Sequence, residues 1–396
     1  MTEELDWLEI CFDILNDYLP PVCDNQKAVS EFAIIVEHAI SIATYFRYKA
    51  LLEYNIYDII KASDLYEKIG ENSDDCAMYE RAFENYRESL LLRQKYLGEM
   101  HSKTATVLDN IGLSYTKTAH YPEAIEYHKK AISIFEKTKG IVDKDTAIAY
   151  NNLGLALVKK GDYKESIKWY RKCLLIEKKL YGEHNIEIAA DYNNIGEVYI
   201  KKGEYENAIK YLLKSLKLKI CILGMDNPNT AITLNNLGST YWRMEQLKRA
   251  KYFTYKSLKI YKSIFGDNHP STALGYNNYA SILADMGNKS DAKKYFFQSL
   301  ESDKNIYGFY HPETALSLFN IGKLYYDDYM LDTALPYLLA SYKIYYSILY
   351  EKHEDLLRVE NLLRLLYDKL GINIEYKNWL KSETNKTIEE LAELLI

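Results

Sequence analysis

The sequence predicts an all-α protein, a right-handed α-α superhelical solenoid built from stacked helix pairs. Three observations predict this fold. Asparagine recurs every 42 residues, a glycine column has the same period, and the 396 residues include only 7 prolines and 17 glycines. A fixed period of tens of residues is typical of stacked repeats, and scarce Pro and Gly disfavour linkers and turn-rich β folds. The periodic asparagines are Asn110, Asn152, Asn194, Asn236, Asn278 and Asn320.

Each 42-residue unit predicts two closely packed helices. The glycine column holds Gly112, Gly154, Gly196, Gly238, Ala280 and Gly322, and a second column of small residues follows twelve positions later. Small residues at two columns with large apolar residues between them let two helices approach closely. In the unit around Gly196 we expect a first helix over 188–202 and a second over 206–223, which Gly224 would end.

The motif around Gly196 resembles the tetratricopeptide repeat. Tyr192-x2-Ile195-Gly196-x2-Tyr199, followed by Ala208, matches its W-x2-L-G-x2-Y…A pattern. The longer second helix, with Gly266-Asp267-Asn268-His269-Pro270 before the next unit, is similar to the 42-residue repeats of kinesin light chains and their bacterial relatives. The resemblance covers Ala62 to Asp355. It implies that the first helix of each pair, the A helix, lines a concave face; the second helix of each pair is called the B helix.

The repeat divides the chain into three regions. Residues 1–61 form an N-terminal helical region, which is either a cap or an effector bundle. Seven repeats follow, of which the first is degenerate, and residues 356–396 are expected to form capping helices, including a final one from Thr387 to Ile396. The repeats span 62–103, 104–145, 146–187, 188–229, 230–271, 272–313 and 314–355.

Charge and cysteine content limit the environment and the classes of partner that we expect for this chain. The net charge is −10 over residues 1–103, +8 over 104–313 and −4 over 314–396. The basic surplus of the middle is too small to favour nucleic acid. The five cysteines include no CxxC pair, so neither a disulfide framework nor a zinc site is expected, and we predict no cofactor and no metal. An acidic N-terminus and the lack of a long apolar run predict a cytoplasmic chain without membrane insertion.

Two adjacent asparagine columns are the first candidate binding surface. An Asn amide offers both a donor and an acceptor, so a row of them can hold the backbone of an extended peptide whatever its sequence. The resemblance implies that use, because related arrays grip peptides with an asparagine ladder. The alternative is that each amide bonds a neighbouring helix. The candidate residues are Asn151, Asn152, Asn193, Asn194, Asn235, Asn236, Asn277 and Asn278.

A charged stripe lies seven residues after the ladder, two helical turns along the same face. It holds Lys117, Lys159, Lys201 and Arg243, and then Asp285 and Asp327. The cationic part would favour an acidic peptide or a terminal carboxylate, although lysine near a helix C-terminus is also ordinary surface. Trp242 and Tyr326, one position earlier in their units, are candidate groove walls.

Motifs of common enzyme classes are absent from the sequence. It contains no GxxxxGK[ST], GxSxG, HExxH or GxGxxG motif. His101, His269 and His311 share a loop column, where we expect them to shape the loop between repeats. We therefore predict a non-enzymatic scaffold or adaptor that binds a protein or peptide partner, with an undetermined oligomeric state. The alternatives are a peptide-sensing regulator whose N-terminal helices act on a target, as in bacterial peptide-pheromone receptors, and an enzyme with an N-terminal site.

Overall fold

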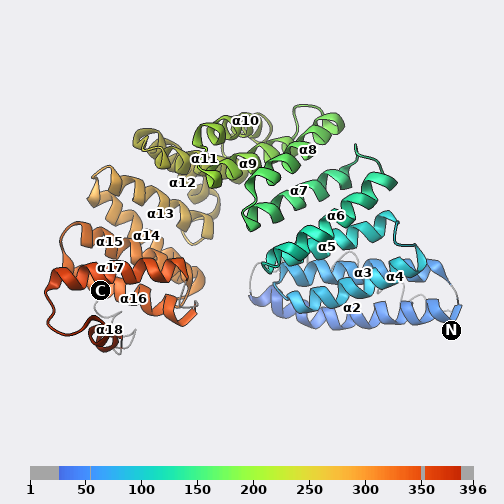
Figure 1. Cartoon of the computed structure of the whole chain (residues 1–396), viewed down its shortest axis with the longest axis horizontal. Helices are drawn as coiled ribbons and strands as arrows, with labels where there is room; N and C mark the ends of the chain where they lie inside the picture. Colours follow the sequence, from blue (N-terminus) through green and yellow to red (C-terminus); the bar gives the residue numbers. More distant parts are fainter. Residues whose placement is uncertain (1–25, 54, 349–352, 385–396) are drawn as a thin grey trace. The chain divides into compact units, whose positions relative to one another are not determined.

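The computed structural model describes residues 26–53, 55–348 and 353–384, which form 17 α-helices (Figure 1). The chain divides into two compact units, Met1–Gly203 and Glu204–Ile396. The predicted final helix at 387–396 lies outside the described residues, as do Cys11 and Cys23.

The first unit contains eight described helices. After α2 they alternate between A helices (α3, α5, α7 and α9) and B helices (α4, α6 and α8). Their bounds are α2 (Gln26–Glu53), α3 (Ile56–Asp75), α4 (Tyr79–Tyr96), α5 (Ser102–Lys117), α6 (Tyr121–Thr138), α7 (Lys144–Lys160), α8 (Tyr163–Tyr181) and α9 (Ile186–Lys202).

The second unit contains nine described helices. It begins with the B helix α10 and continues with alternating A helices (α11, α13, α15 and α17) and B helices (α12, α14 and α16), followed by α18. Their bounds are α10 (Tyr205–Leu223), α11 (Pro228–Arg243), α12 (Leu247–Phe265), α13 (Pro270–Asp285), α14 (Lys289–Tyr307), α15 (Pro312–Asp327), α16 (Leu331–Ile348), α17 (Glu354–Leu370) and α18 (Tyr376–Thr384).

From α5 onward, each A helix follows an N-cap residue that belongs to one column with the 42-residue period. The side chain of this N-cap residue accepts a hydrogen bond from the backbone N–H two residues later, which satisfies one of the exposed donors at the helix start. His101, His269 and His311, predicted to shape the loop, therefore cap helices through their imidazole Nδ1. The column comprises His101, Asp143, Asn185, Asn227, His269, His311 and His353.

A threonine three residues after the cap ties four of the A helices, α5, α7, α11 and α15, to the loops before them. Its Oγ1 donates to the carbonyl oxygen of the glycine that ends the preceding B helix, six residues earlier. The distance from the Thr Oγ1 to the Gly carbonyl oxygen is 2.8–2.9 Å in the four repeats where this bond forms, which contain Thr104, Thr146, Thr230 and Thr314. The bond holds the turn from one repeat to the next.

The glycine column is where the helices of a pair approach most closely. A Cβ added to Gly154 of α7 would lie 2.8 Å from Cε1 of Tyr170 on α8, and one added to Gly322 of α15 would lie 2.7 Å from Cδ2 of Leu338 on α16. Contacts this short are repulsive, so glycine at this column permits the packing predicted from the sequence.

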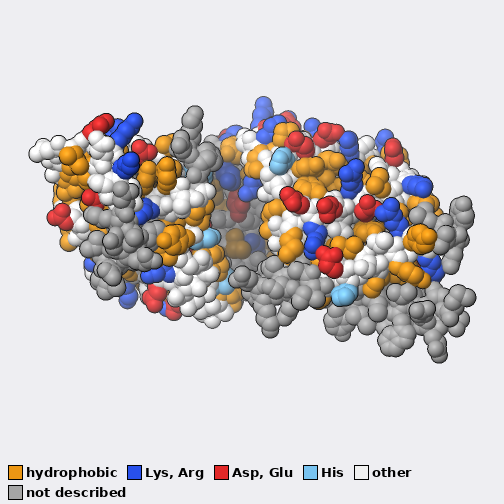
Figure 2. Space-filling view, turned by 90° about the horizontal axis from the view of Figure 1, so that it is seen from below, with side chains coloured by type: hydrophobic (Ala, Val, Ile, Leu, Met, Phe, Trp, Pro, Cys, Tyr) orange, Lys and Arg blue, Asp and Glu red, His pale blue; other side chains and the backbone are white. Residues whose placement is uncertain are grey.

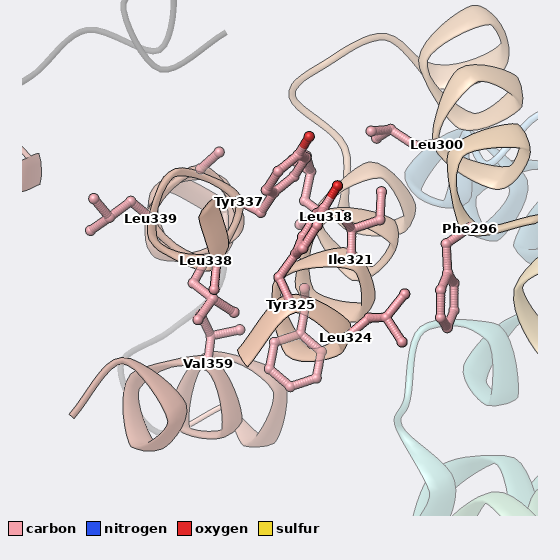
Figure 3. Close-up of a cluster of buried hydrophobic side chains, with 14 of the residues drawn as sticks. Phe296, Leu300, Leu318, Ile321, Leu324, Tyr325, Tyr337, Leu338, Leu339 and Val359 are labelled. Atoms are coloured by element: carbon pink, nitrogen blue, oxygen red, sulfur yellow. The ribbon is translucent and has the colours of Figure 1, made fainter. Parts of the chain in front are cut away.

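Each unit has hydrophobic cores between its own helices. In the first unit, Val36 and Phe46 of α2 pack with Ile59 and Leu65 of α3. In the second, a larger cluster extends from α12 to α18 and includes Leu318, Tyr325 and Leu338 (Figure 3). The A helices are therefore held on one side by their B helices.

Two further expectations concern cysteine and membranes. Cys76 forms a disulfide bond, so the prediction of no disulfide is wrong for this residue, whereas Cys173 and Cys221 are free thiols. Among the described residues, no helix is long and apolar enough to cross a membrane.

Candidate functional site

The two asparagine columns bond to each other between successive A helices. In the first unit, Asn152 Nδ2 donates to Asp109 Oδ2 at 2.8 Å, and Asn194 Nδ2 donates to Asn151 Oδ1 at 3.1 Å. In each case the acceptor lies 43 residues earlier. Asn193, which is buried, donates to Glu197 Oε1 of its own helix.

The second unit repeats this arrangement. Asn278 Nδ2 donates to Asn235 Oδ1 at 3.1 Å, and Asn320 Nδ2 donates to Asn277 Oδ1 at 2.7 Å. The offset of 43 residues is again conserved between the two columns, while Asn236 lies half-buried on α11. We call these paired columns the asparagine ladder. Each such bond uses one of the two N–H groups of the donating amide.

The charged stripe differs from repeat to repeat. Lys117 forms ion pairs with Asp74 and Asp75 of α3. Partial burial opposes the charge of Lys117, but the hydrogen bond and the charge of Asp74 raise its pKa above the ordinary value. Lys159, Lys201 and Arg243 are exposed and form no ion pair with the described residues. Lys117 is thus engaged within the array, whereas these three cations face solvent.

A pocket of about 260 Å³ lies on the A helices of the second unit. Trp242 comes from α11, Asp285 from α13, Asn320, Lys323 and Asp327 from α15, and Arg358 from α17. We call this pocket the groove pocket. Its floor includes Phe296 and Leu324, two members of the large core cluster that lie close together in Figure 3.

The two predicted aromatic walls have defined polar partners. Trp242 Nε1 donates to Asp285 Oδ2 at 2.6 Å, across one repeat. Lys369 Nζ of α17 lies 4.1 Å from the ring centroid of Tyr326, a cation–π distance. Trp242 lines the groove pocket, whereas Tyr326 packs against the core cluster and is not among the pocket's lining residues.

The groove pocket contains both signs of charge, and its cations differ in their partners. Lys323 pairs with Asp327 at 2.8 Å, and both groups are about half exposed. The Arg358 guanidinium lies 4.5 Å from the ring centroid of Phe319 and forms no ion pair with the described residues. Figure 2 shows the same interspersion of acidic, basic and hydrophobic side chains on the face seen from below. The Arg358 guanidinium can therefore bind the carboxylate of a ligand without breaking an ion pair within the protein.

A column of buried charged residues on the B helices was missed by the sequence analysis. Arg93, Glu177, Lys219 and Asp303 are separated by multiples of 42 residues, and each is at least nine-tenths buried. Their spacing was a possible signal, but charged residues on a helix usually mark its solvated face. Arg93 pairs with Asp64 and Glu67 at 2.6 and 2.7 Å.

In the second unit, the residue of this column is Asp303, and the pKa of its carboxyl group is raised. Burial raises the pKa of Asp303 to about 6, and the nearby charge of Glu313 adds to this effect, whereas a hydrogen bond from Ser317 opposes it. The Ser317 Oγ to Asp303 Oδ2 distance is 2.6 Å.

Comparison with known proteins identifies relatives of the repeat. A model described as tetratricopeptide repeat matches residues 60–137, 145–220, 187–263, 229–305 and 272–347, and a second with the same description matches 111–176. No curated protein sequence matches the chain.

Solved structures share the fold at low identity. The apo form of the quorum sensor NprR from B. thuringiensis has a TM-score of 0.59 and 17% identity, covering 87% of this chain and 94% of that one. Apo RapI has a TM-score of 0.55 and 18% identity, with coverages of 72% and 98%. A putative kinesin light chain with TPR-like repeats from Podosopora anserina has a TM-score of 0.46 and 16% identity, with coverages of 52% and 97%.

Proposed function

Because the chain belongs to the tetratricopeptide repeat family, we propose that it is a protein-interaction scaffold or adaptor. It binds an extended peptide segment of a partner along its A helices. The single observation that carries this proposal is the groove pocket, since three successive A helices and α17 contribute an aromatic ring, an amide and opposite charges to one cavity. Peptide sites combine such an apolar wall with a few placed polar groups.

The unpaired cations favour an acidic segment or a terminal carboxylate. Arg358 in the second unit, and Lys159 and Lys201 in the first, form no ion pair with the described residues. A guanidinium can bind a carboxylate through two parallel hydrogen bonds. Binding at Arg358 therefore gains a charge-assisted contact without losing an existing ion pair.

The asparagine ladder supports this role while also joining the repeats. Asn320 uses one N–H to bond Asn277, and its amide retains a second N–H and its own carbonyl oxygen. Those are the groups that a peptide backbone of any sequence can pair with. Asn320 lines the groove pocket beside Arg358, so backbone and carboxylate recognition would occur in the same place.

The test measures binding of defined peptides to the full chain by fluorescence anisotropy at low salt. A library of acidic peptides with free C-termini is compared with the same peptides bearing neutral side chains and amidated ends. We expect selective binding of acidic members and a loss of about 1.5–3 kcal/mol for Arg358→Glu, the value of a charged hydrogen bond. Lys159→Glu with Lys201→Glu should weaken binding to any segment that reaches the first unit.

A matched control is Lys248→Glu, which reverses an exposed lysine on the B helix α12. This variant changes the net charge by the same amount as Arg358→Glu, but Lys248 lies on a B helix whereas Arg358 lies on the A helix α17. Equal losses for both variants would mean that only overall charge matters. Unchanged affinity of the Arg358→Glu variant, with its melting temperature retained, would remove the groove pocket from the proposal.

A peptide-sensing regulator is a second candidate. The likeness to NprR extends over 87% of this chain, and that protein is described as a quorum sensor. In a regulator of this kind, the exposed face of α2 would contact a target, and Tyr48 on that face is 64% exposed. Tyr48→Ala should then abolish target capture without changing peptide affinity. Retained capture would contradict this candidate.

A further inference from the structure

Residues at three equivalent places in the array form a buried triad between a B helix and the next A helix. The first two members are four residues apart on the B helix, and the third follows fourteen residues after the second. The triads are Cys173, Glu177 and Asp191, then Ser215, Lys219 and Thr233, and then Ser299, Asp303 and Ser317. Their shared geometry makes each a control for the others.

In two of these triads, the charged residue has complementary partners. Lys219 Nζ donates to Thr233 Oγ1 at 2.9 Å and to the Asn229 carbonyl at 3.0 Å. Asp303 accepts from Ser317 Oγ at 2.6 Å. A buried charge is tolerated when hydrogen bonds of this kind replace its lost hydration.

The triad of Cys173, Glu177 and Asp191 contains neither a cation nor a hydroxyl group, and the thiol of Cys173, a weak donor, donates to Glu177. Two carboxyl groups face each other there, with a thiol beside them. Cys173 Sγ lies 3.6 Å from Glu177 Oε1, and one ligand atom from each of the three residues falls within 4.8 Å of the others. Glu187 adds further negative charge nearby, which raises the pKa of both carboxyls in addition to the larger effect of burial.

Two oxygen atoms in this triad are buried and without a hydrogen-bond partner. They are Asp191 Oδ2, on a residue that is 3% exposed, and Glu177 Oε2, on a residue that is 9% exposed. Unpartnered buried oxygens carry a desolvation cost of about 1–3 kcal/mol each, so native proteins rarely retain them without a ligand or a role.

We propose that Cys173, Glu177 and Asp191 bind one divalent transition-metal ion of the Zn²⁺ class between α8 and α9. A thiolate with two carboxylates suits a borderline-soft cation better than Mg²⁺ or Ca²⁺, which take oxygen ligands alone. Tetrahedral ligands of zinc lie roughly 3.5 Å apart, which agrees with the sulfur–oxygen distance of 3.6 Å. The cation supplies the positive charge that this triad lacks, and solvent at the margin beside Glu177 completes its coordination.

The cysteine itself fits this role better than the array's usual residue. Ser89, Ser257, Ser299 and Ser341 occupy the column of Cys173, and each donates to a backbone carbonyl 26 residues earlier at 2.7–3.0 Å. The Cys173 thiol is directed instead toward Glu177. Cysteine at this column therefore replaces the hydrogen bond within the helix pair by a thiol contact to a carboxyl group of its own helix, α8.

The test is a titration of the full chain with Co²⁺ under reducing conditions, after removal of bound metal with a chelator. We expect one Co²⁺ per chain, with a thiolate-to-cobalt charge-transfer band, and displacement of the cobalt by Zn²⁺. Zinc should also raise the melting temperature, because it binds the folded state. The same protein purified without chelator should contain metal by elemental analysis.

Each variant of the triad introduces a residue that another triad has at the equivalent position: Ser as in Ser215 and Ser299, and Thr as in Thr233. Cys173→Ser should abolish the charge-transfer band, and Asp191→Thr should weaken binding by at least about 100-fold, since even second-shell changes cost 10–100-fold. Cys221→Ser, which removes an exposed free thiol, should leave the band unchanged. Binding that survives both Cys173→Ser and Asp191→Thr would place the ion elsewhere and overturn the proposal.

The competing explanation is a proton shared between the two carboxyls. In that case the chain shows neither a cobalt band nor a zinc-dependent melting shift, and Asp191→Asn stabilises the metal-free protein. This combination of results would overturn the metal site. A cobalt band lost in Cys173→Ser and retained in Cys221→Ser supports it, whatever the effect of either substitution on stability.

Discussion

Asn320 Nδ2 donates a hydrogen bond to Asn277 Oδ1, 2.7 Å away and on the preceding A helix. The two residues belong to different columns of the asparagine ladder, so the bond joins one repeat to its neighbour. We predict that Asn320→Ala lowers the free energy of unfolding by about 1 kcal/mol, the usual net value of such a bond. Urea denaturation followed by circular dichroism measures this change.

A control for this prediction is another Asn–Asn bond, in which Asn305 donates to Asn268 at 3.2 Å on the exposed surface. Asn305→Ala should cost less than about 0.5 kcal/mol, because solvent replaces an exposed partner. An equal loss in both variants would show that the ladder contributes no more than a surface contact.

The threonine column permits a paired test of one hydrogen bond. Thr230 Oγ1 donates to the Gly224 carbonyl at 2.9 Å, whereas Thr272 Oγ1, at the same column, is buried without a partner. Thr230→Val should destabilise the second unit by about 1 kcal/mol, and Thr272→Val should be neutral or stabilising, because it removes an unsatisfied polar group. Hydrogen exchange of α11 and α13 distinguishes the two. A larger loss in Thr272→Val would contradict this reading of the column.

Gly154→Ala should destabilise the α7–α8 pair. Alanine favours the helix by up to about 1 kcal/mol, but its Cβ would lie 2.8 Å from the buried ring of Tyr170, and overpacking costs about 1–3 kcal/mol. We expect a net loss of about 1 kcal/mol or more by thermal denaturation, reduced when Tyr170→Leu is added. Gly275→Ala is the control, since the atom nearest its Cβ would be Cδ1 at the flexible end of Leu258, 3.1 Å away, and the next contacts are ordinary ones at 3.6 Å. Equal effects at both glycines would exclude the ring as the cause.

The free energy of unfolding should depend on pH through Asp303. Burial raises the pKa of this carboxyl to about 6 in the folded state, against roughly 3.9 in an unfolded chain. The folded state therefore binds the proton of Asp303 more tightly than the unfolded chain does. The stability that this group contributes is fully present below about pH 4 and is lost as the pH rises through about 6. Relative to Asp303→Asn, the wild-type chain should lose about 2 kcal/mol between pH 4 and pH 7.

Urea denaturation at several pH values measures this difference. Asp332→Asn, at an exposed position near the start of α16, controls for the loss of one acidic residue. A wild-type curve parallel to that of Asp303→Asn across this range would mean that the buried carboxyl does not titrate differently in the folded state.

The helices could be predicted closely because their signals are local. The expected helices over 188–202 and 206–223 correspond to α9 (Ile186–Lys202) and α10 (Tyr205–Leu223). Apolar periodicity and the glycine after each B helix from α4 to α14 depend only on neighbouring residues. The small residues at the glycine column likewise predicted the close approach within each pair.

The partners of the candidate site residues depend on distances that the sequence does not contain. Whether Asn194 meets a peptide or Asn151 depends on the offset between adjacent A helices, which is a property of their packing. In the sequence, Lys117 belongs to the cationic part of the stripe like Lys159 and Lys201, yet the A helix before Lys117 places Asp74 within reach of its ammonium group. Buried Lys219 was missed for the same reason, since its hydrogen-bond partners lie on the next helix.

The constant 43-residue step of the asparagine ladder limits how such an array can change in length. Duplicating or deleting one whole 42-residue segment within a unit places every donor opposite an acceptor again, because each new neighbour presents the same column. Adding a few residues inside an A helix rotates the later asparagines away by about 100° per residue and separates them from their acceptors. Gene rearrangement can therefore alter the number of repeats in whole steps, while small insertions are tolerated only in the loops between helices.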